Sequence, residues 1–187
     1  ALGLPHNSIA SVTAARNKAR MRKVLREHGV PVPDARAFPI DENPEILAGQ
    51  VRFPCVLKPL TLSASCGVIR AVNGPDFIAA FRRVAALLHN LGWAQRNDAG
   101  REILVEDFVP GREVALEGLL TAGDLRVLAL FDKPDPLDGP FFEETIYVTP
   151  SRLPAAVQRE IEACAARGAQ ALGLREGPIH GELRVNA

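Results

Sequence analysis

The 187-residue sequence lacks the features that mark secreted, membrane-bound or zinc-binding proteins. Its three cysteines, Cys55, Cys66 and Cys164, lie far apart and show no CxxC or Cys/His metal spacing, so we expect reduced thiols. No apolar run approaches the roughly 20 residues that span a bilayer. The amino-terminal residues also lack a signal-peptide pattern. We therefore expect a cytoplasmic protein with no membrane partner.

Net charge is absent as well, because 22 Lys and Arg residues balance 22 Asp and Glu residues. No overall field would attract nucleic acid. A basic helix between Arg16 and Arg26 leaves that partner as an alternative, and its binding would be salt-sensitive and indifferent to ATP. No aromatic residue is interleaved with these arginines, so the expectation is a protein without a nucleic-acid partner.

Two glycine fingerprints are missing too: the sequence contains neither GxGxxG nor GxxxxGK[ST], which excludes the phosphate cradles of the Rossmann and P-loop folds. Strand patterns interleaved with helical ones, and short links between neighbouring strands, favour an α+β fold with antiparallel sheets. Hydrophobic periodicity predicts helices over 13–28, 75–91 and 154–172, and strands over 53–58, 68–72, 102–109, 113–120, 125–131 and 178–186.

The string FPCVLKPLTLSASCGV holds the first residues with a chemical role. Lys58 ends a strand pattern and precedes a loop of small residues that includes Ser63, Ser65 and Gly67. Backbone N–H groups and hydroxyls of such a loop can bind phosphate oxygens, and the lysine adds a mobile positive charge. The alternative is a surface hairpin whose small residues only permit a tight turn.

These residues resemble the ATP-grasp superfamily, whose members carry a strand-end lysine, a flexible Gly/Ser-rich loop and GV. The opening GLPHNSIASVTAARNKARMRKVLREHGVPVPDA is similar to the family's lead-in, so Lys18 is expected to contact a phosphate, although the family usually has Asp-Lys where this sequence has Asn17-Lys18. The resemblance covers nearly the whole chain. It implies a lead-in helix (1–32), a small lid lobe (33–105) and a larger lobe, incomplete at its carboxyl end (106–187).

The string ILVEDFVPGREVALEGLL supplies the second group. In the family that it resembles, Glu106 and the backbone of Asp107, Phe108 and Val109 bind the adenine edge, and Glu113 accepts the ribose hydroxyls. The residue types suit these roles, since a carboxylate accepts two hydroxyl donors and a strand end presents the donor and acceptor that adenine requires. The alternative is a hairpin of solvent-facing charges.

The resemblance further implies catalytic contacts from Lys133, His180 and Arg184 and a magnesium ligand at Glu182. Lys133 would contact a phosphate, and FFEE (141–144) is similar to the part of amino-acid ligases near the acceptor pocket. Mg²⁺ commonly uses one or two carboxylates together with substrate phosphates, and Mn²⁺ is an alternative ion. The alternatives are a solvated lysine, a neutral strand histidine and a salt bridge between Glu182 and Arg184.

The resemblance therefore implies the core of an ATP-dependent carboxylate-amine (or carboxylate-thiol) ligase that acts through an acyl phosphate with Mg-ATP. The strings KPLTLSASCGVIRA and KPDPLDGPFFEETIYVTP are most similar to amino-acid ligases and to the group of phosphoribosylglycinamide synthetases and biotin carboxylases. Small-molecule carboxylates and amines are the implied substrates, and a homodimer of the full-length protein is left open.

Both ends of the sequence predict a piece of a longer protein, because no methionine begins it and it stops directly after a strand pattern. The family carries a second metal carboxylate, followed two residues later by asparagine, on the next strand. Asn186 cannot be that asparagine, since it belongs to the strand of Glu182. A regulatory ATP-grasp module that binds nucleotide without catalysis is the alternative, and Cys66, where related ligases often carry a larger or basic residue, also favours it. A Glu-x-Asn strand beyond residue 187 would favour the enzyme.

Overall fold

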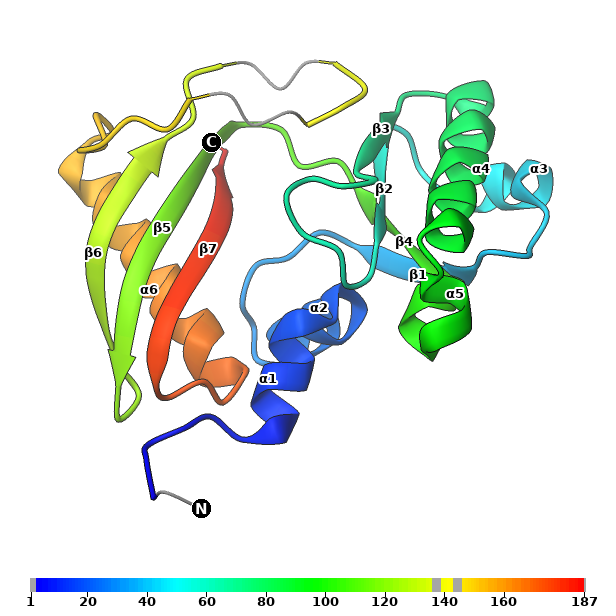
Figure 1. Ribbon diagram of the computed structural model, residues 1–187. Coiled ribbons are helices and arrows are strands. Elements are labelled where there is room, and N and C mark those ends of the chain that lie inside the picture. Colours follow the sequence, from blue (N-terminus) through cyan, green and yellow to red (C-terminus); the bar gives the residue numbers. More distant parts are fainter. Residues whose placement is uncertain (1–2, 136–138, 143–145, 187) are drawn as a thin grey trace.

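The structure, a computed structural model, describes residues 3–135, 139–142 and 146–186. Two antiparallel sheets lie side by side, each with helices packed on one face, and two short amino-terminal helices lie between them (Figure 1). The predicted α+β class with antiparallel sheets is confirmed. Over the described residues, no helix is both long and apolar enough to cross a membrane.

The first sheet has the strand order β1-β4-β2-β3, and all of its pairs are antiparallel. β2 and β3 form the predicted hairpin, whereas β4 comes from later in the chain and inserts between β2 and β1. Helix α4 covers one face through Phe77, Phe81 and Val84, which are buried. The bounds are β1 Ala35–Pro39, α3 Pro44–Leu47, η1 Ala48–Gln50, β2 Cys55–Pro59, β3 Ile69–Ala71, α4 Gly74–Asn90, α5 Trp93–Arg96, η2 Asp98–Arg101 and β4 Glu102–Asp107.

The second sheet has the order β6-β5-β7, and helix α6 packs on one face of it. The alternation predicted for the last strand is confirmed, because Ile179, Leu183 and Val185 pack into the core below α6. Its polar residues consequently project from the opposite face. The bounds are β5 Arg112–Thr121, β6 Asp124–Asp132, α6 Ala155–Ala171 and β7 Gly177–Val185.

The single helix predicted over 13–28 is wrong, since two helices occupy this region: α1 (Ile9–Arg16) and α2 (Lys18–Glu27). Asn17 separates them with an extended backbone, and its side chain accepts a hydrogen bond from the N–H of Arg20. A side-chain acceptor at this position satisfies a helix N-terminus, so Asn17 begins a new helix instead of continuing the first.

A segment from the second sheet crosses to the first. Residues 139–142 follow β6, and there the Pro140 carbonyl accepts a hydrogen bond from the N–H of Arg70 on β3 at 2.8 Å. Phe141 forms a backbone β-bridge with Ile69. The guanidinium of Arg83 lies over the Phe141 ring, with Cζ 4.9 Å from the ring centroid. This crossing segment thus pairs with the outer edge of β3.

The division into residues 1–32, 33–105 and 106–187 stays a prediction. β4 runs across its second boundary, because Glu106 pairs with β1 and β2, and Asp107 pairs with β2. Both residues therefore belong to the first sheet, and the linker to the second sheet begins after them.

Candidate functional site

A buried carboxylate joins α2 to the first sheet. Glu106 is 3% exposed, and each of its oxygens binds a different cation. Arg22 Nε lies 2.6 Å from Oε1, and Lys58 Nζ lies 2.6 Å from Oε2. Burial alone would raise the pKa of Glu106, but Lys58 and Arg22 outweigh it and hold the pKa below its ordinary value. Glu106 is therefore an ionised carboxylate between two cations.

Lys18 and Arg22 stand one helical turn apart on α2, so their side chains project to the same side. Lys18 donates from its backbone N–H to the carbonyl of Leu60 at 2.9 Å and from Nζ to the carbonyl of Leu62 at 2.5 Å. Burial and the positive charge of Lys58 lower the pKa of Lys18. Helix α2 thus brings two cations to the strand end that carries Lys58 and to the loop after it.

The loop between β2 and β3 has a strained backbone. Ala64 and Ser65 have φ values of 53° and 50°, which non-glycine residues seldom adopt. Gly67 has a φ of 76°, and a Cβ there would lie 2.9 Å from the ring of Pro59, so any other residue would be strained at this position. Such strain concentrates at ligand-binding sites, and the loop leaves Ser63 exposed.

The linker after β4 passes between two guanidinium groups. Phe108 lies under Arg70, whose Cζ is 4.1 Å from the ring centroid, and beside Arg184 at 5.2 Å. The N–H of Phe108 donates to the carbonyl of Pro54, and the carbonyl of Val109 accepts from Arg184 Nη1 at 3.2 Å. The N–H of Val109 has no acceptor among the described residues, so it can donate to a ligand.

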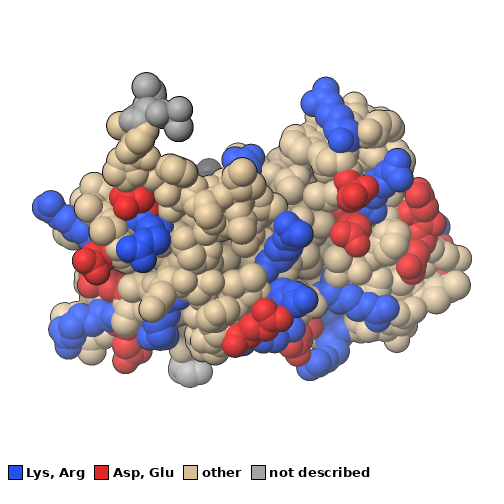
Figure 2. Space-filling model, turned by 90° about the horizontal axis from the view of Figure 1, so that it is seen from below, with Lys and Arg blue, Asp and Glu red and all other residues tan. Residues whose placement is uncertain are grey.

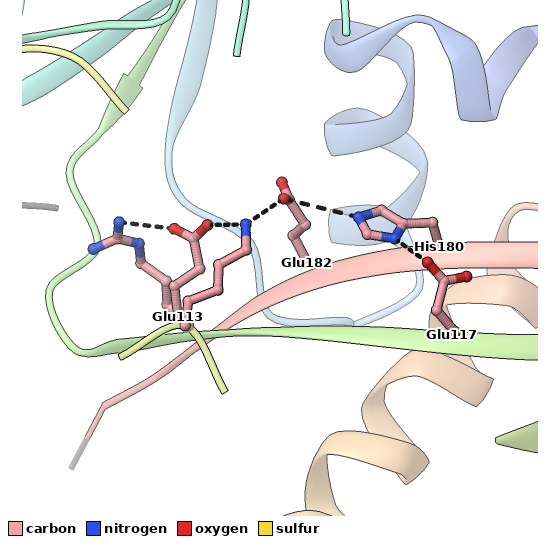
Figure 3. Close-up of polar contacts among 6 residues, drawn as sticks. Glu113, Glu117, His180 and Glu182 are labelled. Atoms are coloured by element: carbon pink, nitrogen blue, oxygen red, sulfur yellow. Dashed lines mark hydrogen bonds and ion pairs between the residues drawn. The ribbon is translucent and has the colours of Figure 1, made fainter. Parts of the chain in front are cut away.

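The second sheet carries a chain of ion pairs on the face away from α6 (Figure 3). Lys133 Nζ lies 2.7 Å from Glu113 Oε1 and 2.7 Å from Glu182 Oε1. Arg184 Nη2 lies 2.8 Å from the other oxygen of Glu113. Burial alone would lower the pKa of Lys133, but its hydrogen bonds to Glu113 and Glu182 outweigh burial and raise the pKa. Lys133 is therefore protonated at any physiological pH.

His180 extends this chain at its other end. Its Nδ1 lies 2.7 Å from Glu117 Oε1, and its Nε2 lies 3.8 Å from Glu182 Oε1 (Figure 3). Glu117 and His180 are directly opposite each other on β5 and β7. The imidazole therefore stands between two carboxylates, half exposed, at 48%.

Figure 2 shows that basic and acidic side chains are interspersed over the face that it draws.

One carboxylate of the second cluster, that of Glu182, could bind a metal ion. Among the residues that the structure describes, no three His, Cys, Asp or Glu side chains are close enough to form a metal cage. Glu182 is a half-exposed hard oxygen donor beside Lys133. A single carboxylate fits the coordination preference of Mg²⁺, because waters and substrate phosphates usually supply most of its ligands.

The structure thus brings most of the predicted site residues into two clusters and a connecting linker. Of two hollows, one of about 220 Å³ is lined in part by the predicted residue Asp107, and one of about 620 Å³ is lined in part by Pro110 and Gly111 of the linker. Of FFEE, Phe142 lies 5.8 Å from Arg184, while Glu143 and Glu144 lie outside the described residues. The two phenylalanines of this string belong to the crossing segment.

Sequence reasoning missed two members of these clusters, Arg22 and Glu117. Arg22 follows Lys18 by four residues, and that helical spacing is a signal that could have placed both on one face. Glu117 lies on β5, opposite His180 on β7. The two strands are far apart in the sequence, so their pairing cannot be read from it.

Comparison with known proteins defines the class. Residues 51–187 match the family described as the ATP-grasp domain. The chain therefore belongs to the ATP-grasp family, as its residues predicted.

Its relatives are ligases. A D-alanine–D-alanine ligase from Gluconobacter oxydans is 33% identical over 184 residues, which are 92% of this chain and 54% of that protein. An alanine–anticapsin ligase from Bacillus subtilis is 24% identical and aligns with 98% of this chain and 41% of its own length. The crystal structure of an L-amino acid ligase from Bacillus licheniformis superposes with a TM-score of 0.81 at 28% identity, covering 99% of this chain and 43% of that one. The chain thus spans about half the length of these relatives.

Proposed function

We propose that the full-length protein is an ATP-dependent ligase that joins the carboxylate of one amino acid to the amine of another. The observation that carries this proposal is the set of three lysines, Lys18 on α2, Lys58 on the first sheet and Lys133 at the end of β6, each held by a contact with a protein oxygen. Supporting it, the similar proteins named above are ligases of alanine and other amino acids.

The lysines would bind the phosphates of ATP. Lys18 and Lys58 flank the strained loop of Ser63, Ser65 and Gly67, so N–H groups, hydroxyls and ammonium groups would surround one phosphate chain. A phosphoryl group in transfer needs little covalent chemistry from the protein, so fixed cations provide most of the stabilisation.

The linker and Glu113 would bind the nucleoside. Val109 offers a free N–H to the adenine edge, next to the backbone of Asp107 and the ring of Phe108. Glu113 already accepts from Lys133 and Arg184, but a carboxylate has about four lone-pair sites and can accept ribose hydroxyls as well. Glu106 has both oxygens bound to cations too, but its side chain is only 4% exposed against 16% for Glu113, so we assign it to holding Lys58 and not to the base.

The reaction would take place in two steps. An oxygen of the substrate carboxylate attacks the γ-phosphorus of ATP, and ADP leaves, which gives an acyl phosphate. The amine then attacks the carbonyl carbon and loses a proton, and inorganic phosphate leaves. We assign to Lys133 and Arg184 the role of offsetting the charge of the transferred phosphoryl group, which is supported by their shared contact with Glu113; His180 is joined to the same ion-pair chain through Glu182.

Magnesium would be held by Glu182 with the nucleotide phosphates, and Mn²⁺ could replace it. When bound, the ion would neutralise phosphate charge. Glu182 would then exchange its contact with Lys133 for the metal, while Lys133 would keep its contact with Glu113 and could also turn toward phosphate.

The test is ADP formation by the full-length protein with magnesium and a panel of amino acids, alongside Lys58→Ala. We expect ADP release that depends on amino acid pairs and that falls by at least about 100-fold in the variant, because a charged phosphate contact is lost. ATP binding without ADP formation would indicate a nucleotide-binding regulatory module. ADP release without amino acid dependence, or an unimpaired variant, would remove the ligase mechanism.

A further inference from the structure

Arg22 is directed at a buried carboxylate and not at solvent. Its Nε lies 2.6 Å from Glu106 Oε1 and its Nη2 lies 3.4 Å from Oε2. The Arg22 side chain is 23% exposed, against 78% for Arg52, whose partners are surface aspartates. A guanidinium that meets both oxygens fixes the plane of a carboxylate, because its rigid fork matches carboxylate geometry.

That plane determines where Lys58 lies. The Oε2 atom of Glu106, which is the oxygen farther from Arg22, lies 2.6 Å from Lys58 Nζ. A lysine stem is flexible, so its ammonium group stays at one place only if a fixed partner holds it.

The charges lead to the same conclusion. Arg22, Lys58 and Glu106 together carry one net positive charge, which is available to a phosphate. Without Arg22, the buried carboxylate would have only Lys58 to balance it, and a buried charge with an incomplete partner set is costly. Lys58 would then be retained by Glu106 and would have little charge to offer a ligand.

We propose that Arg22 is a positioning residue of the nucleotide site, which neutralises and orients Glu106 so that Lys58 remains in place with its charge available to phosphate. This inference deepens the proposed ATP-dependent function and rests on it. Its α2 neighbour Lys18 contacts the loop after β2, so one helix would align both of the lysines at the loop, one directly and one through Glu106.

The first test compares Mg-ATP affinity, by calorimetry, of the full-length protein and of Arg22→Gln, Arg22→Lys and Arg20→Gln. Arg20 is exposed on the same helix, so its variant removes the same charge without touching Glu106. We expect Arg22→Gln to weaken binding by about tenfold or more, Arg22→Lys to recover only part of the loss because it restores the charge without the fork, and Arg20→Gln to change the Kd by less than about twofold. Equal affinities of Arg22→Gln and Arg20→Gln would overturn the proposal.

The second test separates positioning from direct contact, and it decides alone if Arg22→Gln does not fold. In a Glu106→Gln background, Arg22 has no carboxylate to orient, so adding Arg22→Gln should change the Kd by less than about twofold. A further tenfold loss there would mean that Arg22 binds the nucleotide itself, and it would overturn the proposal. A wild-type protein that binds no Mg-ATP would instead contradict the proposed function, and this inference with it.

Discussion

Glu106 is a buried carboxylate whose charge depends on two neighbours. Its burial opposes ionisation, and the contacts with Lys58 and Arg22 more than compensate, so its pKa lies below the ordinary 4.5. A carboxyl with a depressed pKa in the folded state stabilises the fold above its unfolded pKa, and this stability is lost as the pH falls through the folded pKa.

We therefore expect the unfolding free energy to decrease below about pH 4.5 with a contribution from Glu106. Glu106→Gln should lower stability at pH 7 by about 2–4 kcal/mol, because it leaves two cations without their carboxylate. Its stability should depend less on pH in the acid range than that of the wild type. Urea unfolding at several pH values measures the stability at pH 7 and its pH dependence. The same pH dependence of the unfolding free energy in the two proteins would contradict the stabilising role of ionised Glu106.

The cysteines give a second prediction at this scale. Burial raises the pKa of the Cys55 thiol to about 12, so it holds little reactive thiolate at pH 8, whereas Cys66 is exposed in the loop between β2 and β3. We expect a thiol reagent to label Cys66 well before Cys55, and Mg-ATP to slow the labelling of Cys66. Labelling at Cys66 that Mg-ATP leaves unchanged, as peptide mass spectrometry would show, would place the phosphates away from this loop.

At the scale of elements, the break between α1 and α2 fixes the direction of Lys18 and Arg22. Asn17 ends the first helix and caps the second through its side chain, so α2 begins with Lys18 beside the loop. A residue that can cap in the same way should replace it without loss.

Asn17→Ala should destabilise the protein by about 1 kcal/mol, and Asn17→Asp should be nearly neutral, because aspartate caps helices as well as asparagine does. Chemical denaturation of the two variants is the measurement. Equal stabilities of Asn17→Ala and the wild type would show that the cap contributes nothing to α2.

Most elements could be predicted because their periodicity is local. The α4 and α6 helices, the β2–β3 hairpin and the alternating face of β7 follow from apolar spacing and Gly/Pro breaks. β1 was missed because its short sequence, ARAFP, becomes a strand through pairing with β4. The position of β4 between β2 and β1 likewise depends on distant pairing. Lys58 and Glu113 could be found from the sequence, and the spacing of Arg22 from Lys18 was a usable signal, but the position of Glu117 opposite His180 depends on strand pairing and could not be found.

At the scale of the whole molecule, the proposed phosphate site would draw its lysines from three separate regions. Lys18 comes from the amino-terminal helices, Lys58 from the first sheet and Lys133 from the end of β6, and the crossing segment at residues 139–142 ties the second sheet to β3 (Figure 1). In the structure each lysine contacts a protein oxygen. A nucleotide would therefore have to replace several of these contacts, and its phosphates carry enough negative charge to do so.

The most direct test of the account is the affinity of the full-length protein for Mg-ATP, measured by calorimetry for the wild type, Lys58→Met and Lys23→Met. Lys23 lies on α2 with a side chain that is 76% exposed, so it serves as a control for loss of a lysine charge. We predict that Lys58→Met weakens binding by about 10- to 100-fold, as expected for a lost charged hydrogen bond, and that Lys23→Met leaves the Kd unchanged. Binding by Lys58→Met as tight as that of Lys23→Met would contradict the assignment of Lys58 to the phosphates of ATP.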